Sequence, residues 1–232
     1  MSCFKANVLT LFPDMFPGFL GHSLAGKALK NEIWQLNVTN IRDFATDNYK
    51  TVDDEPFGGG AGMVLKPDIV GSAIDSLKNS APLIYFTPRG KLLKQADVRA
   101  FAQMSELNLL CGHFEGVDER VLKKYNAQEI CIGDYVLSGG ESAALIFLDA
   151  IVRLLPGVMG KMESHLNESF ENGLLEAELY TRPQEIFGMK VPEVLLSGDH
   201  AKIAKWRAEK GAEDTKIRRP DLWNIYNKGE KK

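Results

Sequence analysis

The chain has 232 residues, of which 44% are hydrophobic and 25% charged, and its formal net charge is −3. These values are ordinary for a soluble globular protein of one large domain or two modest ones. Three cysteines are too few for a disulfide framework, so a reducing cytoplasm is the expected compartment. The N-terminal apolar run at residues 8–12 is too short for a signal peptide or a membrane span.

The first hundred residues predict strands alternating with helices. Strands are expected at residues 6–11, 33–38 and 83–86, and helices at residues 12–29, 67–77 and 94–103. Residues 41–66 are polar and rich in glycine, with Phe57 and Met63 interleaved. Loops this long in a compact domain are usually functional or disordered. A generic flexible turn is the alternative interpretation of this segment.

Two apolar runs in the middle of the chain each lead into a glycine corner and then a helical pattern. Residues 107–111 precede a corner at Gly112, and residues 130–132 precede a corner at Gly133. Because open α/β sheets bind ligands beyond the carboxyl ends of their strands, the two corners are expected to be adjacent and to form one cradle.

The chemistry expected of this cradle follows from its glycines, which let backbone N–H and C=O groups approach a ligand closely. Such a cradle suits an adenine-containing cofactor. Neither the Gly-x-Gly-x-x-Gly motif nor a Walker A motif is present, which disfavours a nicotinamide or ATP enzyme.

The rest of the chain predicts a long amphipathic helix, a linker and a basic tail. The helix spans residues 140–155, and its apolar stripe is expected to serve the core and a dimer contact. Residues 156–172 have little periodicity, and further helices are expected at residues 201–210 and from Arg218. Residues 199–232 hold ten Lys and Arg against six Asp and Glu. This excess indicates a polyanionic partner, with a solvated charged helix as the alternative.

Residues 111–120 (CGHFEGVDER) and 132–141 (IGDYVLSGGE) resemble the two signatures of the bacterial tRNA (guanine-N1)-methyltransferases, the TrmD family of knotted SPOUT methyltransferases. Shorter family motifs recur at residues 180–183 (YTRP) and 218–220 (RRP), so the resemblance covers nearly the whole chain. It implies an α/β fold of the following parts: a parallel-sheet SPOUT domain with a deep trefoil knot at residues 1–157, a linker at residues 158–172, and a small helical, tRNA-binding C-terminal domain at residues 173–232.

The resemblance implies methyl transfer from S-adenosylmethionine to N1 of guanosine at tRNA position 37, next to the anticodon. It also implies a cytoplasmic homodimer with shared active sites. The implied cofactor-binding residues are Pro88, Gly90, Gly112, Glu115, Ile132, Gly133, Asp134, Tyr135, Val136, Leu137, Gly139 and Gly140. Glu115 is a candidate for holding the cofactor's ammonium group or a Mg²⁺ ion, and an ordinary surface carboxylate is the alternative. The cations expected to contact tRNA are Lys202, Lys205, Arg207, Lys210, Arg218 and Arg219.

Two residues are the implied catalytic groups. Methylation at guanine N1 needs a general base, and Glu168 stands where the family usually has Asp, one methylene shorter. Arg153 matches the family's active-site arginine, which would stabilise negative charge on O6. His113 stands where an arginine is common, and the favoured interpretation is a structural loop residue.

Two other functions stay open. One is a SPOUT methyltransferase with another RNA target, which mapping of the methylated nucleoside would reveal. The other is a tRNA- or S-adenosylmethionine-binding homologue with weakened catalysis, given Glu168 and His113. Tritiated methyl transfer to unmodified tRNA separates this second alternative from an active enzyme.

Overall fold

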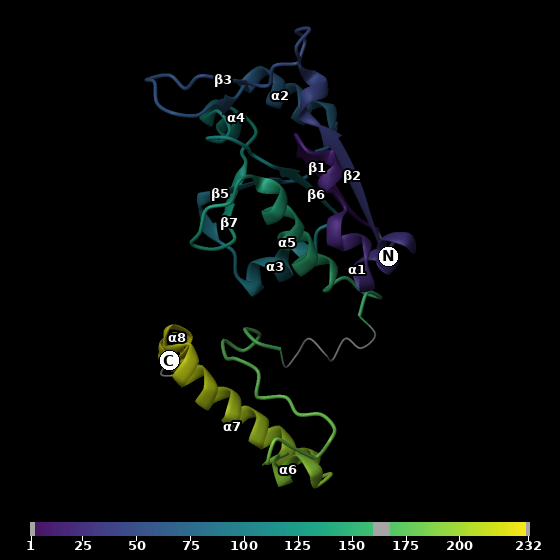
Figure 1. Cartoon of the computed structure of the whole chain (residues 1–232), viewed down its shortest axis with the longest axis vertical. Helices are drawn as coiled ribbons and strands as arrows, with labels where there is room; N and C mark the ends of the chain where they lie inside the picture. Colours follow the sequence, from purple (N-terminus) through teal and green to yellow (C-terminus); the bar gives the residue numbers. More distant parts are fainter. Residues whose placement is uncertain (1–2, 160–167, 231–232) are drawn as a thin grey trace. The chain divides into compact units, whose positions relative to one another are not determined.

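The computed structural model describes residues 3–159 and 168–230, and the chain divides into two compact units, Met1–Gly160 and Lys161–Lys232 (Figure 1). The assignment of the first unit to the cofactor and of the second to tRNA stays a prediction. Across the two described stretches, no helix combines the length and apolar character needed to span a membrane.

The first unit is built on a five-stranded sheet in which all paired neighbours run parallel. Its strands are β1 (Phe4–Thr10), β2 (Trp34–Asn40), β5 (Leu83–Leu92), β6 (Glu106–Leu110) and β7 (Gln128–Cys131), in the spatial order β2-β1-β6-β5-β7. The predicted α/β class with a parallel sheet is therefore confirmed. Parallel strands need crossover connections and bury both faces, which explains their nearly continuous apolar sequences.

Helices cover both faces of this sheet (Figure 1). One face carries α1 (Ser23–Lys30), α3 (Gln95–Ala102) and α5 (Gly140–Val152), and the other carries α2 (Pro67–Ser76) and α4 (Glu119–Lys124). The helix expected over residues 12–29 is wrong in its first half, where two short 3-10 helices, Pro13–Met15 and Gly18–Gly21, precede α1. Pro17 is the physical reason, because it lacks an N–H group and disfavours helical backbone at the residue before it.

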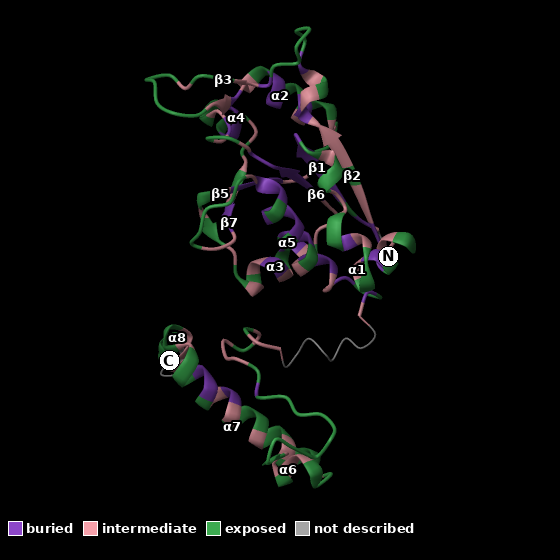
Figure 2. Cartoon of the chain, viewed as in Figure 1, coloured by how far each residue is buried: buried purple, intermediate pink, exposed green. Residues whose placement is uncertain are grey.

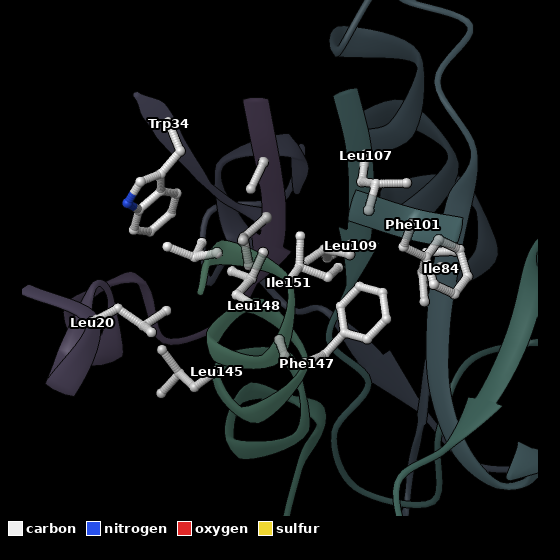
Figure 3. Close-up of a cluster of buried hydrophobic side chains, with 14 of the residues drawn as sticks. Leu20, Trp34, Ile84, Phe101, Leu107, Leu109, Leu145, Phe147, Leu148 and Ile151 are labelled. Atoms are coloured by element: carbon white, nitrogen blue, oxygen red, sulfur yellow. The ribbon is translucent and has the colours of Figure 1, made fainter. Parts of the chain in front are cut away.

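Helix α5 supplies the largest part of the core. Phe147, Leu148 and Ile151 are completely buried, and Figure 3 shows them beside Leu109 of β6. The Phe147 ring packs edge-on against Phe101, with 5.1 Å between ring centroids. Figure 2 shows buried residues on the strands and on α5. The core role expected for this helix is confirmed.

A ladder of asparagine side chains crosses the sheet, with Asn7 and Asn108 buried and Asn37 exposed at the edge strand. Asn7 of β1 is in register with Asn37 of β2 and with Asn108 of β6. The Asn37 amide donates to Asn7 Oδ1, and the Asn7 amide donates to Asn108 Oδ1, both at 2.9 Å. A slip of one residue would turn these polar groups to the opposite face, so the ladder favours a single register.

The long glycine-rich segment contains little regular structure, as expected. After the 3-10 helix Ile41–Phe44, the short strands β3 (Asp53–Asp54) and β4 (Val64–Leu65) pair antiparallel. Between them the chain is exposed (Figure 2), and the Phe57 side chain is 98% exposed.

The second unit contains three helices and one small hairpin among its described residues. These elements are β8 (Glu185–Ile186), β9 (Met189–Lys190), α6 (Glu193–Leu196), α7 (His200–Arg218) and α8 (Pro220–Glu230). The helix expected at residues 201–210 continues to Arg218, where Pro220 starts a new helix. Of the linker predicted at residues 158–172, residues 160–167 lie outside the described part, and residues 168–172 form turns.

Replacing Asn7 with Ala tests the ladder. The change leaves the Asn37 amide and Asn108 Oδ1 without one of their partners, so we expect the free energy of unfolding to fall by about 1–3 kcal/mol. Urea unfolding followed by circular dichroism measures the loss. Asn79→Ala is the matched control, because Asn79 joins the same network from an exposed position. Equal losses in both variants would contradict the role of burial.

Candidate active site

The segments after β6 and around the end of β7 meet residues 85–88 of β5 at a cavity of about 240 Å³. The corners after β6 and β7 follow strands that are not neighbours in the sheet, because β5 lies between them. Strand β5 also does not end at residue 86. It continues to Leu92, and a register shift between Phe86 and Lys91 leaves residues 87–90 outside the ladder with β7.

This bulge explains why residues 87–90 read as a turn in the sequence. Pro88 has no N–H to donate to a ladder. Gly90 lies so close to β7 that a Cβ atom there would be 2.5 Å from the Ile130 nitrogen. The bulge brings Pro88 to the cavity, but Gly90 does not line it.

The two glycine corners are in direct contact. The Gly140 N–H donates to the Gly112 carbonyl at 2.8 Å, and His113 forms an isolated antiparallel bridge with Gly139. A Cβ atom on Gly140 would lie 2.8 Å from the Cys111 Cα. The corners therefore form one cradle, as the sequence predicts.

Most of the residues predicted to hold the cofactor line this cavity. They are Pro88, Gly112, Glu115, Ile132, Gly133, Tyr135, Val136, Leu137, Gly139 and Gly140. Asp134 does not line it, because the Tyr135 N–H donates to the Gly133 carbonyl in a tight turn that leaves Asp134 exposed at its apex.

The sequence prediction missed other lining residues. These are Tyr85, Phe86, Thr87, His113, Phe114, Gly116, Ile130, Cys131, Ser138 and Ala143. Tyr85, Phe86 and Thr87 lie in β5 and Ile130 and Cys131 end β7, so the usable signal was the end of the apolar runs at residues 83–86 and 130–132. His113 lines the cavity as well, and its ring packs 4.9 Å from those of Phe12 and Phe114.

A buried carboxyl group lies behind the two corners. Glu141, on the first turn of α5, is only 2% exposed. The Thr10 hydroxyl donates to Glu141 Oε1 at 2.7 Å, and His113 Nδ1 lies 4.0 Å from Glu141 Oε2. These contacts join the end of β1 to both corners.

The protonation of two groups at the cavity follows from their burial. Burial raises the pKa of the Tyr85 phenol, so its hydroxyl stays protonated at neutral pH. Burial also raises the pKa of the Cys111 thiol well above its ordinary value. That thiol is therefore not poised as a nucleophile.

The donor set of the cavity fits an adenosyl group. Main-chain N–H and C=O groups at the glycine corners can pair with the edge of a base, and Ile132, Leu137 and Ala143 offer apolar surface to its faces. For a metal ion, the residues that the structure describes contain no cluster of three or more His, Cys, Asp and Glu side chains suited to hold one.

A second cavity of about 910 Å³ adjoins the first and shares Tyr85, Thr87 and Glu115 with it. Phe57 lines it from the glycine-rich loop, and Arg89 lines it from the bulge in β5. The Arg89 guanidinium pairs with Glu119 at 3.1 Å and with Glu129 at 3.7 Å. Glu115 thus stands at the boundary between the smaller cavity and a wider, charged one.

Arg153 does not line the cavity of its own chain. It follows the last residue of α5, whereas Gly140 at the start of this helix lines the cavity. At 1.5 Å per residue, the length of α5 separates the two by roughly 20 Å. The structure therefore does not bring Arg153 to the cradle within one chain.

Glu168 belongs to the second unit and opens a turn there, in which the Glu171 N–H donates to the Glu168 carbonyl at 3.3 Å. The Phe170 N–H donates to the Leu174 carbonyl at 2.8 Å, and the Glu176 N–H donates to Ser169 Oγ at 2.9 Å. Glu168 also lines a groove of about 250 Å³ that includes Arg207 of α7.

Most of the cations predicted to contact tRNA are paired with acidic neighbours. The pairs are Lys202–Asp199 at 3.1 Å, Lys205–Glu209 at 3.8 Å, Lys210–Glu213 at 2.7 Å, Arg218–Asp214 at 4.0 Å and Arg219–Asp221 at 2.7 Å. The hydrogen bond from Arg219 lowers the pKa of Asp221 to about 2. The pairs of Lys202, Lys205 and Arg219 are exposed on both sides and contribute little stability, so a phosphate group can replace their carboxylates at small cost.

Comparison with known proteins agrees with this architecture. Residues 4–225 match the tRNA (guanine-1)-methyltransferase family TrmD. A relative from Rhodospirillum rubrum is 60% identical over 223 residues, covering 96% of this chain and 93% of the relative. Relatives from Brucella canis and Brucella ovis are 58% and 57% identical over 229 residues, 99% of this chain and 94% and 95% of theirs. All three are named tRNA (guanine-N(1)-)-methyltransferase. The chain therefore belongs to the tRNA (guanine-1)-methyltransferase family.

Proposed function

We propose that this chain is an S-adenosylmethionine-dependent methyltransferase that modifies N1 of guanosine at tRNA position 37, beside the anticodon. The observation that carries the proposal is the contact between the Gly112 and Gly133–Gly140 corners. These corners hold the two signature segments, and together they wall a cavity suited to an adenosyl group. The family match and the names of the relatives support guanine N1 as the target.

In this proposal the cradle holds the cofactor chiefly through its backbone. S-adenosylmethionine would supply a methyl group carried on a positively charged sulfur. Main-chain groups at Gly112 and in residues 132–140 bind the edge of the adenine base. The Glu115 carboxylate accepts hydrogen bonds from the ammonium group of the cofactor. Mg²⁺ is the other cation for which Glu115 is a candidate. The family also implies that residues near the corners pass through a loop as a trefoil knot.

The chemical step needs a proton acceptor and a group that stabilises negative charge. Glu168 would take the proton from guanine N1 and so free an electron pair there to accept the methyl group, which the cofactor would supply with its neutral thioether as the leaving group. During this step negative charge develops on O6, and the Arg153 guanidinium stabilises it. The longer side chain of Glu168 keeps the carboxylate chemistry of the aspartate usual at this position.

Arg153 leads us to propose a homodimer with shared active sites. Because α5 holds Arg153 roughly 20 Å from the cradle of its own chain, we assign it to the cradle of a second copy. Apolar side chains exposed on the same unit supply a surface for such a contact, namely Met15, Phe19, Leu24 and Ile146. A symmetric dimer uses the same surface on both copies and completes two sites at once.

Methyl transfer to unmodified tRNA tests the proposed reaction. We expect tritiated methyl groups from S-adenosylmethionine to appear as 1-methylguanosine at position 37, measured by nucleoside mapping of the product. Substrate tRNA with adenosine at position 37 is the control and should remain unlabelled. Label in another nucleoside would indicate a different RNA target, and no label would indicate a binding protein with weakened catalysis.

Substitutions of Glu168 test its role as general base. Removing a general base typically costs 10²–10⁴-fold in rate, so we expect kcat of Glu168→Ala to fall by about this factor at saturating tRNA. Glu168→Asp keeps a carboxylate and should retain most of the turnover. S-adenosylhomocysteine binding, measured by calorimetry, should be the same in both variants. Near-normal turnover in Glu168→Ala would rule out the assignment.

A mixed dimer tests whether Arg153 acts on the partner's site. One subunit carries Arg153→Ala and the other carries Gly133→Val, whose side chain would collide with the Tyr135 ring and so disrupt the lining of the cavity. With two different tags the mixed dimer can be purified from both parents. We expect each parent homodimer to be inactive, and the mixed dimer to keep about half of the wild-type turnover, because one of its two sites is intact. If Arg153 acts within its own chain, the mixed dimer will be as inactive as the parents.

A further inference from the structure

The end of the glycine-rich loop is hydrogen-bonded to the first cofactor corner. The Glu115 N–H donates to the Met63 carbonyl at 2.9 Å, and the Leu65 N–H donates to the Gly116 carbonyl at 3.0 Å. Leu65 also forms an isolated parallel bridge with Val117. These bonds place the last residues of the loop alongside Glu115.

Gly62 occupies the point where the loop meets the Glu115 side chain. A Cβ atom on Gly62 would collide with Glu115 Cγ and Oε1, and it would lie 2.7 Å from Cδ. Gly62 also has φ of +93°, a conformation that favours glycine. Within the loop, Gly58, Gly59 and Gly60 have positive φ as well, but a Cβ atom on them would meet nothing within 4 Å.

A side chain at position 62 would change the orientation of the Glu115 side chain more than it would change the fold. The atoms it would meet are the end of a flexible, exposed side chain, which can rotate away at low cost. The corner itself is held by backbone hydrogen bonds that do not involve this side chain. The carboxylate would therefore leave the boundary between the two cavities while the cradle stays formed.

We propose that Gly62 is a positioning residue for Glu115. Its missing side chain lets the carboxylate lie against the loop, directed to the cationic ammonium end of the cofactor. The glycine-rich loop thereby determines how the cofactor's charged end is held. This inference rests on the proposed function, since it takes the ligand of the first cavity to be S-adenosylmethionine.

A double-mutant cycle tests the inference, with S-adenosylhomocysteine as the probe because it carries the same ammonium group. Calorimetry gives its dissociation constant for wild type, Gly62→Ala, Glu115→Ala and the double variant. A lost charge-assisted hydrogen bond weakens binding by about tenfold, so we expect this loss in each single variant. The double variant should match Glu115→Ala within about twofold, because Gly62 acts only through Glu115.

Gly59→Ala is the matched control for backbone strain. Gly59 has φ of +76° and open space around it, so its substitution adds comparable strain without touching Glu115. We expect its dissociation constant to change by less than about twofold. If Gly62→Ala does not fold, the double variant, which has room for the added methyl group, still provides the comparison with Glu115→Ala.

The outcomes separate this inference from the proposed function. Wild-type protein that does not bind S-adenosylhomocysteine would overturn both. If the wild type binds it but Gly62→Ala binds equally well, only the role of Gly62 fails. The role also fails if Gly59→Ala loses as much affinity as Gly62→Ala, or if the double variant binds at least about fivefold more weakly than Glu115→Ala.

Discussion

The hydrogen bond from the Gly140 N–H to the Gly112 carbonyl is the contact on which the rest of the first unit depends. Gly140 begins α5, the helix whose far turns fill the core with Phe147 and Ile151. The same residue therefore sets both the packing of the helix on the sheet and the spacing of the cavity walls. A Cβ atom there would meet the Cys111 Cα, so even the smallest side chain would force the helix away from β6. Core stability and ligand binding are linked through this one close approach.

The elements of the sheet were readable from the sequence, but their order in space was not. Apolar runs predict strands because a parallel sheet buries both faces, and this holds for β1 and β6. The insertion of β5 between β6 and β7 depends on long-range pairing, which no local pattern encodes. The bulge at Pro88 and Gly90 was predicted as the end of a strand, because its pairing with β7 is also long-range. Only the neighbouring strand shows that pairing resumes beyond it.

The candidate site was predictable to a similar degree. Glycine corners could be recognised because few other residues allow such close backbone contact, and Gly112 and Gly140 prove to touch. The side chains of Tyr85 and His113 were missed because their place at the cavity follows from the convergence of strands far apart in the sequence. Arg153 shows a different limit. The predicted helix already placed it many residues after Gly140, and the structure shows that this distance keeps it away from the cavity of its own chain.

That separation bears on how the proposed enzyme would control its reaction. The cradle is formed within one chain, but Arg153 of that chain does not line its cavity. Some catalytic groups reach their site only when subunits assemble or substrate binds, and the binding energy then brings them into place. The reaction therefore proceeds only after the correct substrate has bound. The weak ion pairs along α7 fit this arrangement, because phosphates can take over their cations at little cost. In the enzyme proposed above, a methyl donor held in an incomplete site would be protected from transfer to the wrong acceptor.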